Sequence, residues 1–475
     1  MCAAPFRSPP SQQSLIQHFN SILSSGFKPF LTSLRLPLQM DVSKTIKNAS
    51  TKLLNAFVDS VFEFVDQPFL PSQSNFAPVN ELREAVTVTS IEGEIPDDFP
   101  EGIYIRNGTN PLYGVKPTKS LLGRSNTECK TFKIEKQLNK RSFLPAVEGD
   151  SLSVLSAYLL NWLRFGEVNK LYSNTSVIEH SGKFYAIAEN GLPQEIDSFT
   201  LETLGTWDVN EARSQPFTSH PKRAPGTSEL VIMGFQATKP FVEVGVVSTG
   251  GKKLLHKVDL KLNRGIVSSE IGVTESYTVF LDCPISTDIN RLVQGGPLIK
   301  FKKDEYARIG IMPRYGDVDS IKWFDVKPNC TYHIINCFED GNEIVVWGCR
   351  ALESIIPGPD FGKNIFEWFS SKFRPIGSVG QSGDAVTEDA LIFSRPYEWR
   401  LDMHTGDVKE RNLTGTEFGL DFPIINEALT GLKNKCSYMQ VVDSIASSAA
   451  GMPTYGGLAR LYFEELNHEF SLRKG

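Results

Sequence analysis

The chain has 475 residues, 40% of them hydrophobic and 22% charged, a length and composition that can build a large core. Its formal net charge is −6, so we expect no nucleic-acid footprint and no nucleic-acid partner. No apolar run reaches about 18 residues, the length that a membrane-spanning helix needs.

Residues 1–40 are rich in Ser, Pro and Leu, and no acidic residue occurs before Asp41. Arg7, Lys28 and Arg35 give this segment a mild positive charge. The pattern fits a plastid or mitochondrial transit peptide. An ordinary disordered N-terminus has the same composition, so both readings stay open.

Two segments have the apolar spacing of amphipathic helices. Residues 51–66 (TKLLNAFVDSVFEFVD) predict a helix within a helix-and-linker region over residues 41–80. Residues 151–165 (SLSVLSAYLLNWLRF) are the second candidate. Such stripes usually pack against the protein's own core. The stripe predicted for the second helix consists of Leu152, Leu155, Leu159, Trp162 and Leu163.

From about residue 83 the pattern changes to short β-runs separated by Gly, Asp and Asn turns. Many hairpins without interleaved helices indicate an all-β sandwich, barrel or propeller, and no fixed-period repeat chooses among the three. The seven cysteines form no CxxC pair and lie in apolar runs, so we expect reduced core thiols and no thiolate metal site. They are Cys2, Cys129, Cys283, Cys330, Cys337, Cys349 and Cys436.

The clearest hairpin lies within residues 312–350, where the apolar runs TYHIINCF and EIVVWGCR flank the turn EDGN. His333 lies inside the first run. Local sequence allows two interpretations of this residue. It is either a buried histidine with a satisfied hydrogen bond or an imidazole ligand of a metal ion.

Six longer segments have distinctive sequences. They read EIPDDFPEGIYIRNGTNPLYG (94–114), PFTSHPK (216–222), IGVTESYTVFLD (271–282), PGPDFG (357–362), YEWRL (397–401) and RNLTGTEFGLDFPIINEALTGLKNK (411–435). With the surrounding text, from about residue 57 to about 466, they resemble the plant carotenoid cleavage dioxygenases of the 9,10(9',10') group. The resemblance implies an all-β, seven-bladed β-propeller over residues 81–475, with a metal on its axis.

The family holds a non-haem iron(II) with four histidines, because neutral imidazoles suit this ion and leave positions open for dioxygen. His220, in PFTSHPK, matches the first ligand, and His333 matches the third. Ser269 stands where the family has the second histidine, and a serine hydroxyl is a poor iron ligand. Glu270 follows it, and strand alternation predicts that its side chain faces away from the axis.

Two further departures predict an incomplete propeller. Asn126 runs directly into Thr127, where the family carries an additional segment. The tail LNHEFSLRKG contains His468, but its context does not match the fourth ligand, so we expect that ligand and the C-terminal strands to be absent. An open ring leaves unpaired strand edges.

Three acidic residues fall where the family places the carboxylates that orient its histidines. They are Glu189 in AIAENGLP, Glu398 in PYEWRL and Asp421 in GLDFPIIN. A solvated turn or strand-end acid is the alternative for each of them. That alternative is weakest for Glu398, which stands between Tyr397 and Trp399 in a predicted strand.

The resemblance implies oxidative cleavage of a carotenoid or apocarotenoid double bond of the 9,10 type, with O2 as co-substrate and an apolar, aromatic-lined tunnel for the polyene. With two of four ligands, we expect Fe(II) to be bound weakly. The alternative is a non-catalytic remnant that binds carotenoid or a partner chain. The family also predicts peripheral membrane contact through its helices, and we expect a plastid location with the cytosol as the alternative.

Overall fold

The computed structural model describes residues 44–61, 128–144, 151–268, 270–354, 392–415, 418–450, 453–463 and 471–473, with scattered positions between 89 and 107. This set does not include residues 1–40, Asn126, Thr127, Ser269 and His468. The predictions about these residues therefore lie outside the described part of the chain. The chain divides into two compact units, residues 1–63 and residues 64–475.

The described part of the first unit is helix α2 (Lys44–Val61). It confirms the first predicted helix but begins before residue 51, and residues 62–66 are not described. Its side chains Leu53, Phe57 and Val61 are exposed by 73%, 49% and 57%. No helix in the described ranges is long and apolar enough to cross a membrane.

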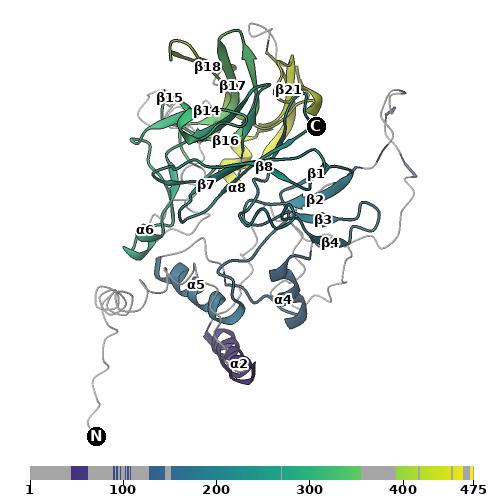
Figure 1. Ribbon diagram of the computed structural model, residues 1–475, viewed down its shortest axis with the longest axis vertical. Helices are drawn as coiled ribbons and strands as arrows, with labels where there is room; N and C mark the ends of the chain where they lie inside the picture. The colour runs from purple at the N-terminus through teal and green to yellow at the C-terminus, as the bar shows by residue number, and fades with distance from the viewer. Residues whose placement is uncertain are drawn as a thin grey trace. The chain divides into compact units, whose positions relative to one another are not determined.

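The second unit contains four described helices, and α5 (Ser151–Phe165) has the predicted bounds (Figure 1). The predicted stripe is wrong in part, because Leu152 and Leu163 are exposed while Asn161 is fully buried. The Asn161 side chain accepts from the Leu144 N–H (2.9 Å) and donates to the carbonyls of Leu144 (2.8 Å) and Val168 (3.0 Å). The other helices are α4 (Lys130–Leu138), α6 (Ile289–Val293) and α8 (Ser444–Ala450).

Asn161 therefore faces inward because it satisfies buried backbone groups, a role that no apolar residue could take. We expect Asn161→Ala to lower the free energy of unfolding by about 1–3 kcal/mol, because these groups lose their partners. Urea unfolding measures this loss. Leu163→Ala on the exposed side of α5 is the control and should change stability by less than about 0.5 kcal/mol. Equal losses in the two variants would contradict the role given to Asn161.

The rest of the described unit is β-structure, which confirms the all-β prediction. Every pairing between its strands is antiparallel, and five of its sheets have four strands each. Sheet one contains β1 (Ser176–His180), β2 (Lys183–Ile187), β3 (Gln194–Ile196) and β4 (Thr203–Thr206). Sheet two contains β5 (Lys222–Arg223), β6 (Leu230–Phe235), β7 (Val242–Val247) and β8 (Leu254–Asp259).

The next two four-stranded sheets follow in chain order. Sheet three contains β10 (Gly272–Val273), β11 (Tyr277–Asp282), β14 (Ala307–Pro313) and β15 (Lys322–Val326). Beside it lies a small sheet of β9 (Gly265–Ile266), β12 (Ile285–Thr287) and β13 (Ile299–Phe301). Sheet four contains β16 (Cys330–Asp340), β17 (Glu343–Ala351), β18 (Arg395–Asp402) and β19 (Val408–Asn412). The predicted hairpin is β16–β17, and Gly341 in its turn has φ +63°, a conformation that favours glycine.

Sheet five contains β20 (Leu420–Ile424), β21 (Cys436–Val442), β22 (Tyr455–Tyr462) and β23 (Ser471–Arg473). β23, in the tail that departs from the family spelling, pairs with β22. Short 3-10 turns at Val318–Ser320 and Glu427–Leu429 complete the described elements.

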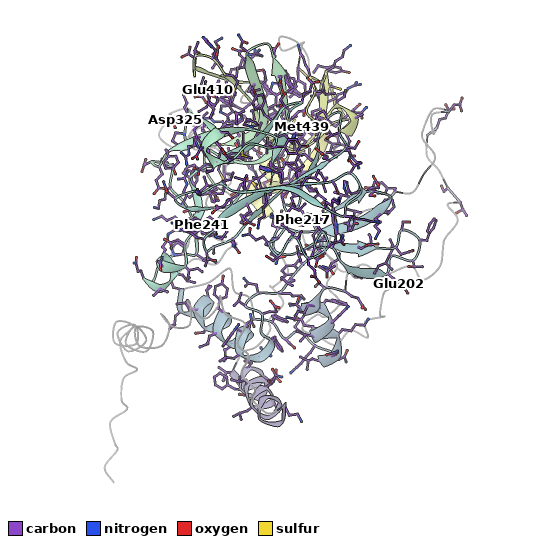
Figure 2. The ribbon with its side chains drawn as sticks, in the orientation of Figure 1. Glu202, Phe217, Phe241, Asp325, Glu410 and Met439 are labelled. Carbon is purple, nitrogen blue, oxygen red and sulfur yellow. The ribbon has the colours of Figure 1, made fainter. Side chains whose placement is uncertain are left out.

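Successive sheets pack face to face, and a separate apolar cluster fills each interface. Phe217, between sheets one and two, and Met439, between sheets four and five, are fully buried examples (Figure 2). Because inner sheets are covered on both faces, β6 and β7 are almost continuously buried and show no alternation. β10 contacts β5 and β16, and β16 contacts β20, so the first strands of these sheets gather at one centre, as in the blades of a propeller.

Candidate metal centre

His220 and His333 meet at this centre. His220 lies just before β5 and forms a single parallel bridge with Glu270, while His333 lies in β16 next to a register shift. Their ring centroids are 5.9 Å apart and their planes cross at 84°. The structure thus brings together two histidines that are 113 positions apart in the chain (333 − 220).

His333 is held by Asp421 of β20. Its Nδ1 lies 2.7 Å from Asp421 Oδ1, and that carboxylate also accepts from Ser394 Oγ (2.6 Å) and the Phe422 N–H (2.8 Å). Burial alone would lower the pKa of His333, but the hydrogen bond and charge of Asp421 outweigh it and the pKa is raised. Burial would raise the pKa of Asp421, yet the interaction with His333 lowers it. Since Nδ1 is engaged, Nε2 is the nitrogen left for a metal.

His220 faces a different carboxylate. Its Nδ1 lies 3.7 Å from Glu270 Oε1, and Lys222 Nζ lies 3.0 Å from the same oxygen. Burial lowers the pKa of His220, and the negative charge of Glu270 offsets this only in part. The ring is therefore held neutral, which is the form that binds metal ions.

The expectation that Glu270 faces away from the centre is wrong. Its carboxylate contacts His220 and Lys222 and accepts a hydrogen bond from the backbone N–H of Ile334. Strand alternation does not apply here, because Glu270 makes only an isolated bridge and β10 begins at Gly272.

The other two predicted carboxylates have no hydrogen bond to either histidine in the described part of the chain. Glu189 accepts a hydrogen bond from Ser219 Oγ, the residue before His220, and lies 3.5 Å from Thr175 Oγ1. Glu398 is buried in β18, where it accepts from Trp347 Nε1 (2.9 Å) and Arg411 Nε (2.7 Å). The role predicted for Glu398 came from its sequence motif alone. In the structure its carboxylate oxygens bond with residues of its own sheet.

Two residues at the centre, Lys222 and Ser394, were not predicted from the sequence. Lys222 Nζ lies 3.0 Å from Glu270 Oε1, and Ser394 Oγ donates to Asp421 Oδ2. Lys222 belongs to the quoted segment PFTSHPK, so its position two residues after His220 was an available signal. Ser394 lies 27 positions before Asp421 (421 − 394), and nothing in the local spelling links them.

The family model described as retinal pigment epithelial membrane protein, RPE65, matches residues 76–474. The chain belongs to the RPE65/carotenoid oxygenase family. Carotenoid 9,10(9',10')-cleavage dioxygenase 1 of Pisum sativum is 28% identical over 444 residues, which cover 86% of this chain and 76% of that protein. Isoeugenol monooxygenase of Pseudomonas nitroreducens is 30% identical over 281 residues, covering 58% of this chain and 54% of that protein. These relatives are oxygenases, so the chain is an oxidoreductase by descent.

Solved structures of this oxygenase family share the fold. The crystal structure of Pseudomonas brassicacearum lignostilbene dioxygenase matches with a TM-score of 0.56 at 21% identity, over 73% of this chain and 68% of that one. Cobalt-substituted Synechocystis ACO matches with a TM-score of 0.54 at 17% identity, over 72% of this chain and 67% of that one.

The donor set of this oxygenase-family chain fits the implied iron only in part. No group of three or more His, Cys, Asp and Glu side chains among the residues that the structure describes is arranged to hold a metal ion. His220 and His333 fit two positions of a four-imidazole set, because each directs Nδ1 toward a carboxylate and keeps Nε2 for a metal. The described residues therefore supply half of such a set.

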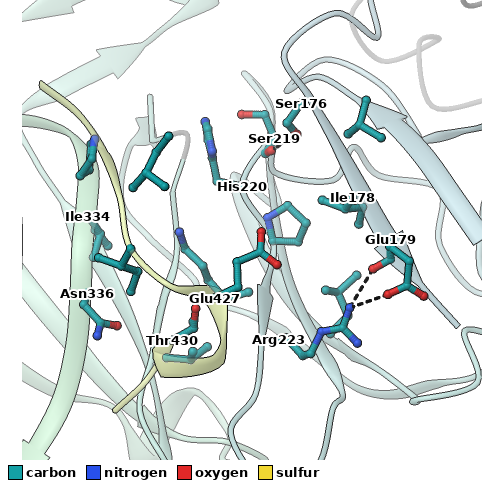
Figure 3. A pocket seen from close by; sticks show the side chains of 18 of the residues that line it. Ser176, Ile178, Glu179, Ser219, His220, Arg223, Ile334, Asn336, Glu427 and Thr430 are labelled. Carbon is teal, nitrogen blue, oxygen red and sulfur yellow. Dashed lines mark hydrogen bonds and ion pairs between the residues drawn. The ribbon is translucent and has the colours of Figure 1, made fainter. Parts of the chain in front are cut away.

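A cavity of about 650 Å³ lies beside His220 (Figure 3). Ile178 of β1 and Ile334 of β16 line it. Arg223 and Glu179 also line it, and Arg223 Nη2 lies 3.0 Å from Glu179 Oε2. Further polar lining residues are Ser176, Ser219, Lys222, Asn336, Glu427 and Thr430. Most of the other lining residues are apolar, among them Val177, Phe184, Leu230, Val273, Ile335, Ile424 and Ile425. The cavity therefore has mixed walls, and the apolar polyene tunnel stays a prediction.

Proposed function

We propose that this chain is a non-haem iron(II) oxygenase that cleaves a carotenoid or apocarotenoid double bond oxidatively, with a metal centre reduced to His220 and His333. The approach of the two imidazoles, 5.9 Å between ring centroids, is the observation that carries the proposal. Iron(II), when bound, supplies the activation of dioxygen. The chain's own residues orient the imidazoles, with Asp421 and Glu270 beside their Nδ1 atoms, and burial favours the neutral form of His220.

The architecture that supports this proposal is a β-propeller of the carotenoid oxygenase type. Five four-stranded sheets with facing apolar clusters, four of them with adjoining first strands, support the assignment of five blades in the proposed seven-bladed ring. We infer that the ring is incomplete, as the Asn126–Thr127 junction predicts. Glu189, Glu398 and Asp421 remain the proposed orienting carboxylates, and of these Asp421 has the direct contact with a proposed ligand.

The 9,10 type of cleavage is proposed from the Pisum sativum relative and from the plant spelling of the quoted segments. Exposed apolar side chains on α2, namely Leu53, Phe57 and Val61, support peripheral contact with a membrane, where lipid-soluble carotenoids reside. A plastid location follows from the composition of residues 1–40, with the cytosol as the alternative.

One specific observation favours a second candidate function. Because the described residues assemble no group of three metal-binding side chains, the chain is alternatively a non-catalytic protein that binds carotenoid or an interaction partner. In that case iron would be held weakly or not at all, since each lost ligand lowers affinity.

The decisive experiment loads the purified chain with Fe(II) anaerobically, then adds O2 and an apocarotenoid and measures bound iron and released ionone. The proposed function predicts that the chain binds iron, with no more than one ion per chain. It also predicts ionone release that stops when iron is chelated. Carotenoid binding without iron and without ionone would establish the alternative function. Heat-denatured chain with the same iron provides the control for oxidation by free metal.

A further inference from the structure

Glu270 links the segments that carry the two histidines. Only 5% of this residue is exposed, and its carboxylate is shared among three partners. Oε1 contacts Lys222 Nζ at 3.0 Å and His220 Nδ1 at 3.7 Å, while the backbone N–H of Ile334 donates to Oε2. Lys222 is two positions after His220, and Ile334 directly follows His333.

The contact with Ile334 reaches the backbone of β16 where the register shifts on both sides of His333 and Ile334. Ladder hydrogen bonds are interrupted at such an irregularity, so a carboxylate that accepts from a free N–H stabilises that local backbone. The position of His333 along its strand then depends on Glu270. Asp421, on the opposite side, determines the rotation of the ring through Nδ1.

Lys222 Nζ, 3.0 Å from Glu270 Oε1, supplies a positive charge beside this buried carboxylate. A charged acceptor makes stronger hydrogen bonds than a neutral one, which suits a group that must hold two segments at a defined separation.

We propose that Glu270 is a positioning residue that sets the distance and orientation of His220 relative to His333. It replaces part of the order that a complete set of imidazoles around an ion would impose. Its effect on metal binding rests on the proposed function, whereas its effect on the two rings does not.

The test uses the full chain and compares Glu270→Gln with a matched control, Glu135→Gln. Glu135 is also buried, pairs with Lys170 at 2.6 Å, and accepts from the backbone N–H of Ser142 (2.8 Å) and Phe143 (3.1 Å), but it lies on α4. Both variants lose one buried carboxylate with a lysine partner. A general loss of stability should therefore appear in both variants, whereas a change at the two histidines should appear only in Glu270→Gln.

Co(II) affinity is measured by calorimetry, together with the visible absorption of bound Co(II). Glu270→Gln should weaken Co(II) binding by about 10- to 100-fold and change the absorption, as loss of an orienting partner commonly does. Glu135→Gln should stay within about twofold of the parent chain. Glu270→Asp, which keeps the charge, should recover part of the affinity. Parent-like Co(II) binding by Glu270→Gln would overturn the proposal.

A second measurement needs no metal. In chain labelled only at histidine, the parent should show a nuclear Overhauser cross-peak between ring protons of His220 and His333, and so should Glu135→Gln. Glu270→Gln should lose that cross-peak. If the parent binds no Co(II) yet shows this pattern, the proposed metal function fails and the positioning role stands. A cross-peak of unchanged intensity in Glu270→Gln would refute the positioning role.

Discussion

A His333→Ala chain is expected to bind Fe(II) more than about 100-fold more weakly than the parent chain and to release no measurable ionone. In the proposed centre His333 is one of two imidazoles, and Asp421 holds its ring at 2.7 Å through Nδ1. Its removal leaves His220 without a second donor and leaves the Asp421 charge partly buried without its partner. The loss should therefore exceed the effect of removing an orienting carboxylate.

Anaerobic titration against a chelator measures the iron affinity, and gas chromatography measures the ionones. The matched control is His404→Ala, since His404 is exposed in a turn, where its backbone N–H donates to Asp402 Oδ1 (2.8 Å). That variant should bind iron and turn over like the parent chain. Circular dichroism and thermal unfolding should show that both variants keep the β-fold. Iron affinity unchanged by His333→Ala would exclude His333 from the centre and with it the proposed function.

An Asp282→Ala chain is expected to lose about 3–5 kcal/mol of unfolding free energy, because it breaks a buried ion pair from one side. Asp282 ends β11 and is fully buried. Its Oδ1 accepts from Arg264 Nε and its Oδ2 from Arg308 Nε, each at 2.9 Å, and both guanidinium groups lie over the Tyr306 ring. Without the carboxylate, two cations remain close together in a partly buried cluster.

Urea unfolding followed by tryptophan fluorescence measures this loss. Glu305→Ala is the control within the same cluster, because Glu305 also pairs with Arg264, at 3.1 Å, but is 39% exposed. An exposed pair contributes less, so this variant should lose less than about 1 kcal/mol. If both variants lost the same free energy, burial would not be what makes Asp282 important.

Elements specified by nearby residues were predicted well. The apolar repeat of residues 151–165 predicts α5 with its observed bounds, and the EDGN turn predicts the β16–β17 hairpin around Gly341. Helical and strand periodicities express backbone geometry over a few residues, so they can be read directly from the spelling. The burial of Asn161 could not be read in this way, since its partners Leu144 and Val168 lie in the flanking segments.

The candidate centre shows the same division. The sequence motifs around His220 and His333 indicate that each descends from a metal ligand of the family, and the structure brings the two rings together. Asp421 also reaches His333, as the spelling suggests. Glu398 also lies in a family motif, but its carboxylate bonds with Trp347 and Arg411, because its place in β18 directs it to neighbours within the sheet.

By itself, the sequence determined the all-β class, two of the helices, the hairpin and the histidines that mark the family, because each depends on a local pattern or on an inherited motif. Only the tertiary structure decided that Glu270 joins the two histidine segments and that a cavity with mixed apolar and polar walls lies beside His220. The physical reason is that side-chain partners 48 to 88 positions apart are selected by the packing of one sheet on the next. Strand alternation does not contain that information, and it ends where the regular ladder ends, at the isolated bridge of Glu270.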